Sequence, residues 1–374
     1  MFSKGLNVIN MLYNYYVMKK TVLSLLLIIA LTFVGCKQSK TPVTKTGVYF
    51  DTVISITLYE NNSSKLIDDC FEIADRYEQL FSKTITESDV SKVNSSYNQW
   101  INVNEETYDL ISRSFEYEEL SGGRFSVMCG ALTSLWDVSG KSDILVPSTD
   151  FNGNKSTNPS TVLSEQSIVP TESEITTVKR LCGMHTLDMD ESTHSVRVNT
   201  IGAKLDLGAV AKGYIADKMK EYLISKGVTS GIIQLGGNVL LIGENPTKPD
   251  GFYNIGISTP FYGTNLQRSD NEVITAVSEK DTSIVTSGNY QRYFEYNDRI
   301  YHHIIDLTTG YPADTGLNSV TIITDNSCDA DALSTVCFLL GKEKGANLLD
   351  SLNSSNVNII SAVFVDSKNQ VVNY

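Results

Sequence analysis

The stretch Asp329-Ala330-Asp331-Ala332-Leu333-Ser334-Thr335 decides the fold that we expect for the C-terminal part of the chain. A β-branched run at 319–324 precedes it, and an apolar run that ends at Gly341 follows it. This order predicts a strand, a short loop and a helix. Asp331 and Thr335 are four residues apart, so a helix presents both on one face, where their oxygen atoms suit a hard cation such as Mg²⁺. The alternative interpretation is that Asp331 only caps the helix and Thr335 only packs.

The composition of the chain limits the classes of protein to which it can belong. Its 374 residues are 41% hydrophobic, which is enough to bury a sizeable core in one or two domains. The net charge of −13 argues against a nucleic-acid-binding protein, since such proteins need a basic surface. A phosphate ligand is still compatible with this charge, because a bound cation can override the global field locally. The six cysteines include no CxxC pair, so we expect neither a zinc site nor a disulfide framework.

The N-terminal residues have the pattern of an export signal. Lys19-Lys20 precede an apolar run at 21–31, which is short for a membrane-spanning helix. The following Phe33-Val34-Gly35-Cys36 resembles the lipobox of bacterial lipoproteins, which are cut before a cysteine that carries lipid. We therefore expect residues 1–35 to be a signal peptide, whose natural start is Met18.

Lipidation of Cys36 would fix the location of the mature protein. We expect a lipid-bearing cysteine and a polar tether over 36–47, followed by a single domain over 48–374. More than one acyl chain on Cys36 would anchor the protein stably. The predicted location is the bacterial cell membrane, facing the periplasm or the cell exterior, with the lipid anchor as the only membrane contact.

The first half of the domain reads as a mixture of strand and helix. Alternation over 48–59 predicts one strand, while 64–81 and 105–120 have helical periodicity. The polar residues 88–94 predict a loop. Residues 139–172 lack periodicity and are rich in Ser, Thr, Asn, Asp and Pro, which predicts an inserted loop; of the functional and the disordered interpretation, we favour the disordered one.

A second stretch with chemical content runs from Lys204 to Asp217. It predicts a strand that ends at Asp206-Leu207-Gly208 and a helix that continues to about residue 225. Small residues leave the backbone accessible, and a helix N-terminus favours a phosphate group. Lys212 would add a positive charge. An ordinary strand-to-helix turn with a surface lysine is the alternative.

Two of the four histidines of the chain, His302 and His303, lie shortly before Asp306 and a Gly/Pro turn. A histidine near the end of a strand can act as a general base. A structural role is the commoner one for a histidine, but the pair beside Asp306 favours a function.

Five motifs in this order resemble those of the ApbE family of FAD:protein FMN transferases. They are Asp206–Tyr214 (DLGAVAKGY), Leu235–Asn238 (LGGN), Thr286–Tyr290 (TSGNY), His303–Gly310 (HIIDLTTG) and Asp329–Thr335 (DADALST). The resemblance implies an α+β fold of mixed β-sheets flanked by helices, with the active site in a central cleft. The order of the predicted elements is not a βαβ alternation, which also argues against a doubly wound sheet.

The resemblance implies a reaction in which FMN passes from Mg²⁺-bound FAD to a Thr or Ser hydroxyl of a target protein. A phosphoester forms and AMP leaves. The implied metal ligands are Ala209, Asp331, Ser334 and Thr335. The implied FAD-binding residues are Phe50, Thr84, Arg124, Phe125, Ser126, Asp206, Lys212 and Ile305. His303 or Asp306 is the expected general base.

The implied partners are FAD and the flavin-accepting subunits of membrane redox complexes, of the sodium-pumping NADH:quinone reductase or Rnf type, or other exported flavoproteins. Two other functions fit the same motifs. One is a metal-dependent FAD pyrophosphatase, in which water replaces the protein hydroxyl. The other is a flavin-binding lipoprotein without catalytic activity.

Overall fold

The computed structural model describes residues 41–60, 63–145, 168–354 and 359–373. The predicted signal peptide, with its start at Met18, and the predicted lipidation site Cys36 lie outside these residues. So does the part of the expected insertion between residues 146 and 167. None of the described helices combines the length and the apolar character that crossing a membrane requires.

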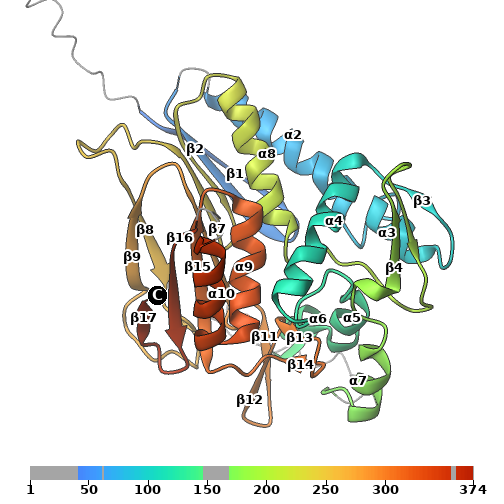
Figure 1. Ribbon diagram of the computed structural model, residues 1–374. Helices are drawn as coiled ribbons and strands as arrows, with labels where there is room; N and C mark the ends of the chain where they lie inside the picture. The colour runs from blue at the N-terminus through green and yellow to red at the C-terminus, as the bar shows by residue number, and fades with distance from the viewer. Residues whose placement is uncertain (1–40, 61–62, 146–167, 355–358, 374) are drawn as a thin grey trace, which may run out of the picture. The chain divides into compact units, whose positions relative to one another are not determined.

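An eight-stranded sheet forms the centre of the described chain (Figure 1). All its neighbouring strands pair antiparallel, which excludes a doubly wound sheet and confirms the α+β class. The strand order across the sheet is β1 (Val43–Tyr49), β2 (Thr52–Leu58), β6 (Ser230–Leu235), β7 (Asn238–Gly243), β10 (Ser283–Gly288), β15 (Leu317–Thr324), β16 (Ile359–Asp366) and β17 (Val371–Asn373).

Both faces of this sheet are covered, as β15 illustrates: every one of its residues is buried. Neighbouring side chains of a strand point to opposite faces. Ile322 belongs to the main core beneath the helices, whereas Ile323 packs in a second cluster with Tyr253 of the hairpin β8 (Tyr253–Ser258) and β9 (Val273–Glu279). A strand buried on both sides reads as a continuous β-branched run, and this is the pattern of 319–324.

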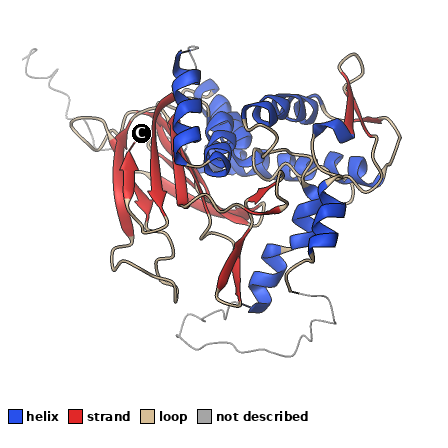
Figure 2. Ribbon diagram, turned by 60° about the horizontal axis from the view of Figure 1, so that its bottom comes forward, coloured by secondary structure: helices blue, strands red, loops and turns tan. Residues whose placement is uncertain are grey.

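Helices cover the main-core face (Figure 2). They are α2 (Ser63–Phe81), α8 (Ala211–Ser225), α9 (Ser327–Leu340) and α10 (Lys342–Ser354). Helix α9 is buried almost all round, because it packs on β10 and β15 and also against α8 and α10. Its sequence is therefore apolar on nearly every side, and only a few buried polar residues, such as Asp331 and Ser334, interrupt the pattern.

A second group of elements lies beside this layer, and part of it packs around Trp136. The Trp136 indole N–H donates to the carbonyl of Gly310 at 2.8 Å, which ties this group to the turn after Asp306. The elements are α3 (Asp89–Ser95), β3 (Ile101–Asn102), α4 (Glu105–Leu120), α5 (Gly130–Trp136), α6 (Val138–Leu145), α7 (Glu172–Lys179), η1 (Met184–Thr186), β4 (Leu187–Asp190), β5 (Ser195–Val198), β11 (Tyr293–Tyr296), β12 (Arg299–His302), β13 (Ile305–Asp306) and β14 (Tyr311–Pro312).

The N-terminal strand differs from the prediction. Residues 48–59 do not form one strand, and 43–47 are not tether, because β1 and β2 form a hairpin that turns at Phe50 and Asp51. Both turn residues have a positive φ of 54°. Such turns usually carry Gly or Asn, so the sequence lacks the usual signal. The turn is held from outside, since the Phe50 N–H donates to the Glu78 carboxylate at 2.6 Å.

Two other local predictions are wrong. Residues 89–95 form α3 instead of a loop, and Ser88 caps it by accepting the Ser91 N–H at 2.9 Å. Residues 204–208 do not form the strand expected directly before α8; Leu205 instead bonds through both backbone groups to the side chain of Asn94. The first part of the expected insertion is also ordered as α6, and α7 begins at its end.

Helices α8 and α9 approach each other closely at Gly213. A Cβ atom on Gly213 would lie 2.2 Å from the carbonyl oxygen of Ser327 and 2.7 Å from the Cα atom of Cys328. These are backbone atoms that cannot rotate away, so any side chain at this position would push the helices apart. The N-terminal end of α8 is thereby brought against the first turns of α9.

We predict that Gly213→Ala lowers the free energy of unfolding by about 1–3 kcal/mol, because a methyl group overpacks the contact between α8 and α9. This loss occurs although Ala is favoured over Gly in a helix by about 1 kcal/mol. Gly345→Ala on α10 is the control. Its Cβ would meet the Cys337 side chain at 3.2 Å, which a small shift relieves. Urea unfolding of both variants measures the difference, and equal effects would contradict the tight contact.

Candidate active site

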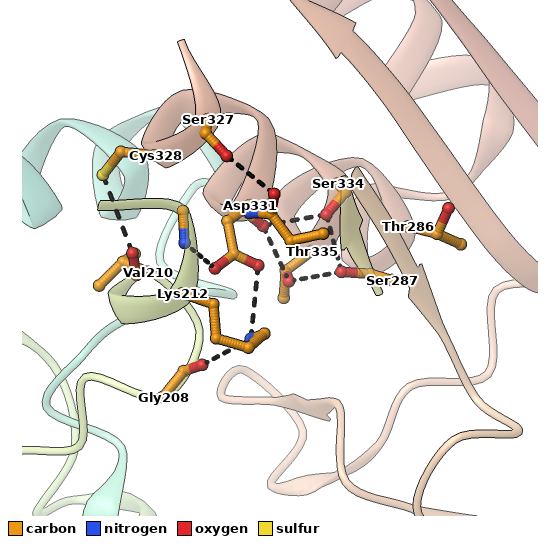
Figure 3. Close-up of polar contacts among 12 residues, drawn as sticks. Gly208, Val210, Lys212, Thr286, Ser287, Ser327, Cys328, Asp331, Ser334 and Thr335 are labelled. Carbon is orange, nitrogen blue, oxygen red and sulfur yellow. Dashed lines mark hydrogen bonds and ion pairs between the residues drawn. The ribbon is translucent and has the colours of Figure 1, made fainter. Parts of the chain in front are cut away.

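The Asp331 carboxylate lies at the contact between α8 and α9. Its side chain is almost fully buried, and Oδ2 accepts the backbone N–H of Gly213 at 2.9 Å. Oδ1 lies 3.5 Å from the Lys212 ammonium group, which also donates to the carbonyl of Gly208 at 3.1 Å (Figure 3). Asp331 therefore does not cap its own helix. Asn326 does so, by accepting the Asp329 N–H.

Burial raises the pKa of Asp331, and the positive charge of Lys212 and the Gly213 N–H oppose part of that rise. A carboxylate in this position gains from any further positive charge that approaches it. The environment of Asp331 is thus suited to a bound cation, which would add to the single ammonium group that faces it.

The bond from Gly213 changes the start of α8. In a regular helix the Gly213 N–H would donate to the carbonyl of Ala209, four residues earlier, but here it donates to Asp331. Helix α8 accordingly begins at Ala211. The backbone hydrogen bonds described for this part of the chain do not use the carbonyl oxygen of Ala209, as its expected role as a metal ligand requires.

Three hydroxyl groups lie beside Asp331 (Figure 3). Ser287 at the end of β10 lies 2.8 Å from Ser334 Oγ and 2.9 Å from Thr335 Oγ1. Ser334 also donates to the carbonyl of Asp331 at 2.9 Å. These bonds fix the direction of each hydroxyl and leave oxygen lone pairs free. The helical spacing predicted from the sequence does bring Asp331 and Thr335 to one side of α9.

This donor set fits Mg²⁺ better than a transition metal. It consists of one carboxylate, hydroxyl groups and a free carbonyl, all hard oxygen donors. The described residues contain no cluster of three or more His, Cys, Asp or Glu side chains. A site with one carboxylate is typical of Mg²⁺ that also binds the phosphates of a substrate.

His302 and His303 lie in different surroundings. His302 is buried and uses both ring nitrogens: Nε2 bonds to the carbonyl of Ala313 at 2.9 Å, and Nδ1 accepts the N–H of Ile304 at 3.3 Å. His303 is only half-buried, and its Nδ1 donates to the carbonyl of Arg292 at 3.2 Å. This bond places the proton on Nδ1 and leaves Nε2 of His303 as an acceptor.

Although part of its ring is exposed, loss of solvent around His303 lowers its pKa to about 3, and the neighbouring His302, Arg292 and Lys212 contribute to the drop. The imidazole is therefore neutral at pH 7.

Asp306 is committed to structural partners. Its Oδ1 accepts the N–H and the hydroxyl of Thr308 at 2.8 and 2.6 Å, and its Oδ2 pairs with the Arg124 guanidinium. The backbone adds a link, because the Leu307 N–H donates to the carbonyl of Arg124 at 3.0 Å. Arg124 and Asp306 were expected to bind FAD and to act as a base, respectively, and the structure joins them to each other.

Asp206 forms a further polar group with residues that the sequence did not single out. Its carboxylate bonds to the Lys83 ammonium at 2.7 Å and to the Thr133 hydroxyl at 3.0 Å. Burial would raise the pKa of Asp206, but Lys83 and these hydrogen bonds lower it below the usual value. Thr84 is exposed next to Lys83. The Asp206 N–H donates to the carbonyl of Val127 at 2.8 Å, so segment 124–127 contacts both Asp206 and the Asp306 turn.

The remaining residues expected in the FAD site are largely buried side chains. Phe125 and Ile305 belong to hydrophobic clusters, and Ser126 accepts the Met128 N–H at 3.1 Å. Phe50 is half-buried at the turn of the N-terminal hairpin. The side chains of Phe125 and Ile305 are therefore part of the hydrophobic core in this structure.

Among the hollows at the surface of the described residues, two are lined by lysine side chains. The larger, about 550 Å³, lies between the start of α2 and the end of α8, away from the expected site. The smaller, about 230 Å³, borders the Asp206 group through Lys83, and Asp331 lines neither. The residues of the smaller hollow are Lys83, Ser91, Asn94, Ser95, Gly130, Ser134, Lys204 and Leu205.

Ser287 is a member of this site to which the sequence assigned no role, although it lies inside the TSGNY motif. Lys83 and Thr133 had no signal, because only the tertiary fold brings them to Asp206.

Comparison with known proteins relates this arrangement to a family. A model described as "ApbE family" matches residues 50–360. The chain belongs to the ApbE family. A curated relative from Klebsiella pneumoniae (strain 342), named FAD:protein FMN transferase, is 31% identical over 327 residues, which cover 87% of this chain and 90% of the relative. A relative of the same name from Treponema pallidum (strain Nichols) is 33% identical over 290 residues, covering 76% and 73%.

Solved structures of ApbE proteins share the fold. The ApbE protein of Thermotoga maritima superposes with a TM-score of 0.73 at 29% identity, covering 89% of this chain and 97% of that chain. The flavin transferase ApbE of Vibrio cholerae gives a TM-score of 0.69 at 22% identity, with 89% and 96% covered. The second likeness supports the fold alone, and the fold class expected from the sequence is confirmed.

We predict that Arg124→Met lowers the free energy of unfolding by about 2 kcal/mol, because it leaves the buried Asp306 carboxylate without its ionic partner. Removal of one member of a buried pair costs about 3–5 kcal/mol, and the partial exposure of Arg124 reduces this value. Chemical unfolding at pH 7 measures the change.

Arg197→Met is the matched control, since Arg197 pairs at 2.6 Å with Asp188 and both side chains of that pair are about one-third exposed. We expect a loss of at most about 1 kcal/mol for the control. An Arg124 variant as stable as the wild type would show that the pair with Asp306 is not a structural link.

Proposed function

We propose that this ApbE family protein transfers FMN from Mg²⁺-bound FAD to a threonine or serine hydroxyl of a target protein, with release of AMP. The relatives named FAD:protein FMN transferase establish the enzyme class. The observation that carries the metal-dependent mechanism is the buried Asp331 carboxylate, held between the Gly213 N–H and Lys212 with free oxygen donors around it.

Asp331, Thr335, Ser334 and the carbonyl of Ala209 would hold the cation. A bound Mg²⁺ would neutralise charge on the FAD pyrophosphate. Ser287 would orient the hydroxyls of Ser334 and Thr335 through its own hydrogen bonds. Because the chain offers a single carboxylate here, we infer that the pyrophosphate completes the coordination shell and that metal and FAD bind together.

Lys212 would supply a further positive charge to the pyrophosphate. Its ammonium group is held at the start of α8 by the carbonyl of Gly208 and by Asp331, where the N-terminal end of the helix also favours negative charge. We propose that Asp206, Thr84 and Arg124 contact other parts of FAD, while Phe50, Phe125, Ser126 and Ile305 shape its surroundings.

His303 is the better of the two proposed general bases. Its Nδ1 is fixed by the carbonyl of Arg292, which leaves Nε2 as the ring atom that can accept a proton. Asp306 has both carboxylate oxygens engaged by Thr308 and Arg124. Proton acceptance by Asp306 would require the loss of bonds that hold the turn.

The acceptor and the location remain proposals that rest on the sequence. We propose flavin-accepting subunits of membrane redox complexes, of the sodium-pumping NADH:quinone reductase or Rnf type, or other exported flavoproteins as targets. The lipobox-like sequence before Cys36 supports a lipid anchor at the outer side of the bacterial cell membrane.

We predict that Asp331→Ala lowers the rate of FMN transfer by about 100-fold or more, because the cation loses its only carboxylate ligand. The assay combines the domain, FAD, Mg²⁺ and a protein that carries a flavinylation motif, and follows covalent label by in-gel flavin fluorescence. Chelation of Mg²⁺ in the wild type should abolish the label to the same extent.

Asp68→Ala is the control, since Asp68 is an exposed carboxylate that pairs with Lys45 away from the site. Near-normal transfer by the Asp331 variant would refute the metal assignment. Release of free FMN and AMP by the wild type without covalent label would identify a pyrophosphatase, and unchanged bound FAD would identify a non-catalytic flavin-binding protein.

A further inference from the structure

The Asp217 carboxylate on α8 holds the first turn of α9. Its Oδ1 accepts the backbone N–H of Ser327 and its Oδ2 accepts that of Cys328, both at 2.9 Å. Asp217 lies four residues after Gly213, so both face α9 from the same side of α8. In the opposite direction, Asp331 on α9 accepts the N–H of Gly213 on α8. Each helix therefore gives a carboxylate to backbone N–H groups of the other.

This exchange adds directed hydrogen bonds to the side-chain packing between α8 and α9. The first N–H groups of a helix have no acceptor within the helix. The side chain of Asn326, the capping residue of α9, accepts a hydrogen bond from the Arg113 guanidinium and, of the backbone N–H groups in this turn, from that of Asp329 in the described contacts. Asp217 accepts the N–H groups of Ser327 and Cys328, the two residues before Asp329. Its negative charge is favourable at the positive end of α9.

The same turn of α9 has further anchors on other elements. Asp329 accepts hydrogen bonds from Arg113 at 2.9 Å and from the Tyr117 hydroxyl at 2.6 Å, both on α4. The Ser327 hydroxyl bonds to Asn238 and to Ser283 of the central sheet, each at 2.9 Å. These anchors hold the turn in place, and Asp217 is the one that joins it to the helix carrying Lys212 and Gly213.

We propose that Asp217 is a positioning residue for the metal site: by clamping the start of α9 to α8, it holds the Asp331 carboxylate at the Gly213 N–H and beside Lys212. The inference rests on the proposed function, in which Asp331 binds the cation. In the described contacts, Asp217 touches neither Asp331 nor the hydroxyls of Ser287, Ser334 and Thr335. It therefore acts through the placement of α9.

Asp217→Asn tests the clamp with little change in side-chain volume. Its amide offers one acceptor oxygen and turns an NH₂ group toward the second backbone N–H, so one of the two bonds is lost. Tyr222→Phe, farther along α8, is the matched control. It removes a 2.5 Å hydrogen bond to Asp69 that joins α8 to α2, and it leaves the contact with α9 intact.

The readouts are Mn²⁺ binding with FAD present, followed through the electron paramagnetic resonance signal of the free ion, and the Mg²⁺ concentration that gives half-maximal transfer. For Asp217→Asn we expect Mn²⁺ binding about tenfold weaker, a similar rise in the half-saturating Mg²⁺ concentration, and a rate at saturating Mg²⁺ within about twofold of the wild type. Tyr222→Phe should leave all three unchanged.

Wild-type metal binding by Asp217→Asn would overturn the proposal. So would a rate loss that saturating Mg²⁺ does not restore, or a variant that fails to fold, because either result would make Asp217 a general structural residue. Asp331→Ala separates this failure from that of the proposed function. If that variant still binds Mn²⁺ as the wild type does, the metal assignment is wrong irrespective of Asp217.

Discussion

The hydrogen bond between the Asp331 carboxylate and the Gly213 N–H is the interaction on which the site depends. It requires a glycine at 213, because a Cβ atom there would collide with the backbone of α9. It also diverts the N–H that would otherwise bond to Ala209, and so frees a carbonyl oxygen at the start of α8. One contact between two helices thus buries a carboxylate, opens a backbone acceptor and places Lys212 beside the carboxylate.

The central sheet makes this contact possible. Strand β15 leads directly into α9, and it is buried on both faces, so the start of α9 cannot move without disturbing the core. Strand β10 pairs with β15 and delivers Ser287 to the two hydroxyls of α9. The other polar groups join the site through backbone bonds of segment 124–127, which contacts both Asp206 and the turn after Asp306.

The sequence was sufficient for the elements whose pattern is local. The sequence pattern predicts that α8 ends near residue 225 and α9 near Gly341, and the spacing of Asp331 and Thr335 correctly predicts a shared face. The hairpin turn at Phe50 and Asp51 was missed, because a bond from Glu78, distant in sequence, stabilises it. The pairing of Arg124 with Asp306 and of Lys83 with Asp206 likewise depends on tertiary contacts that no spacing in the sequence encodes.

The most direct test of the central claim is a crystal structure of the domain with FAD and Mn²⁺, in which anomalous scattering locates the metal. The account predicts one strong peak within bonding distance of the Asp331 carboxylate and the Thr335 hydroxyl, adjoining the carbonyl of Ala209 and the FAD pyrophosphate. A pyrophosphate-bound Mn²⁺ away from Asp331, with the bond between Asp331 and Gly213 broken, would contradict it.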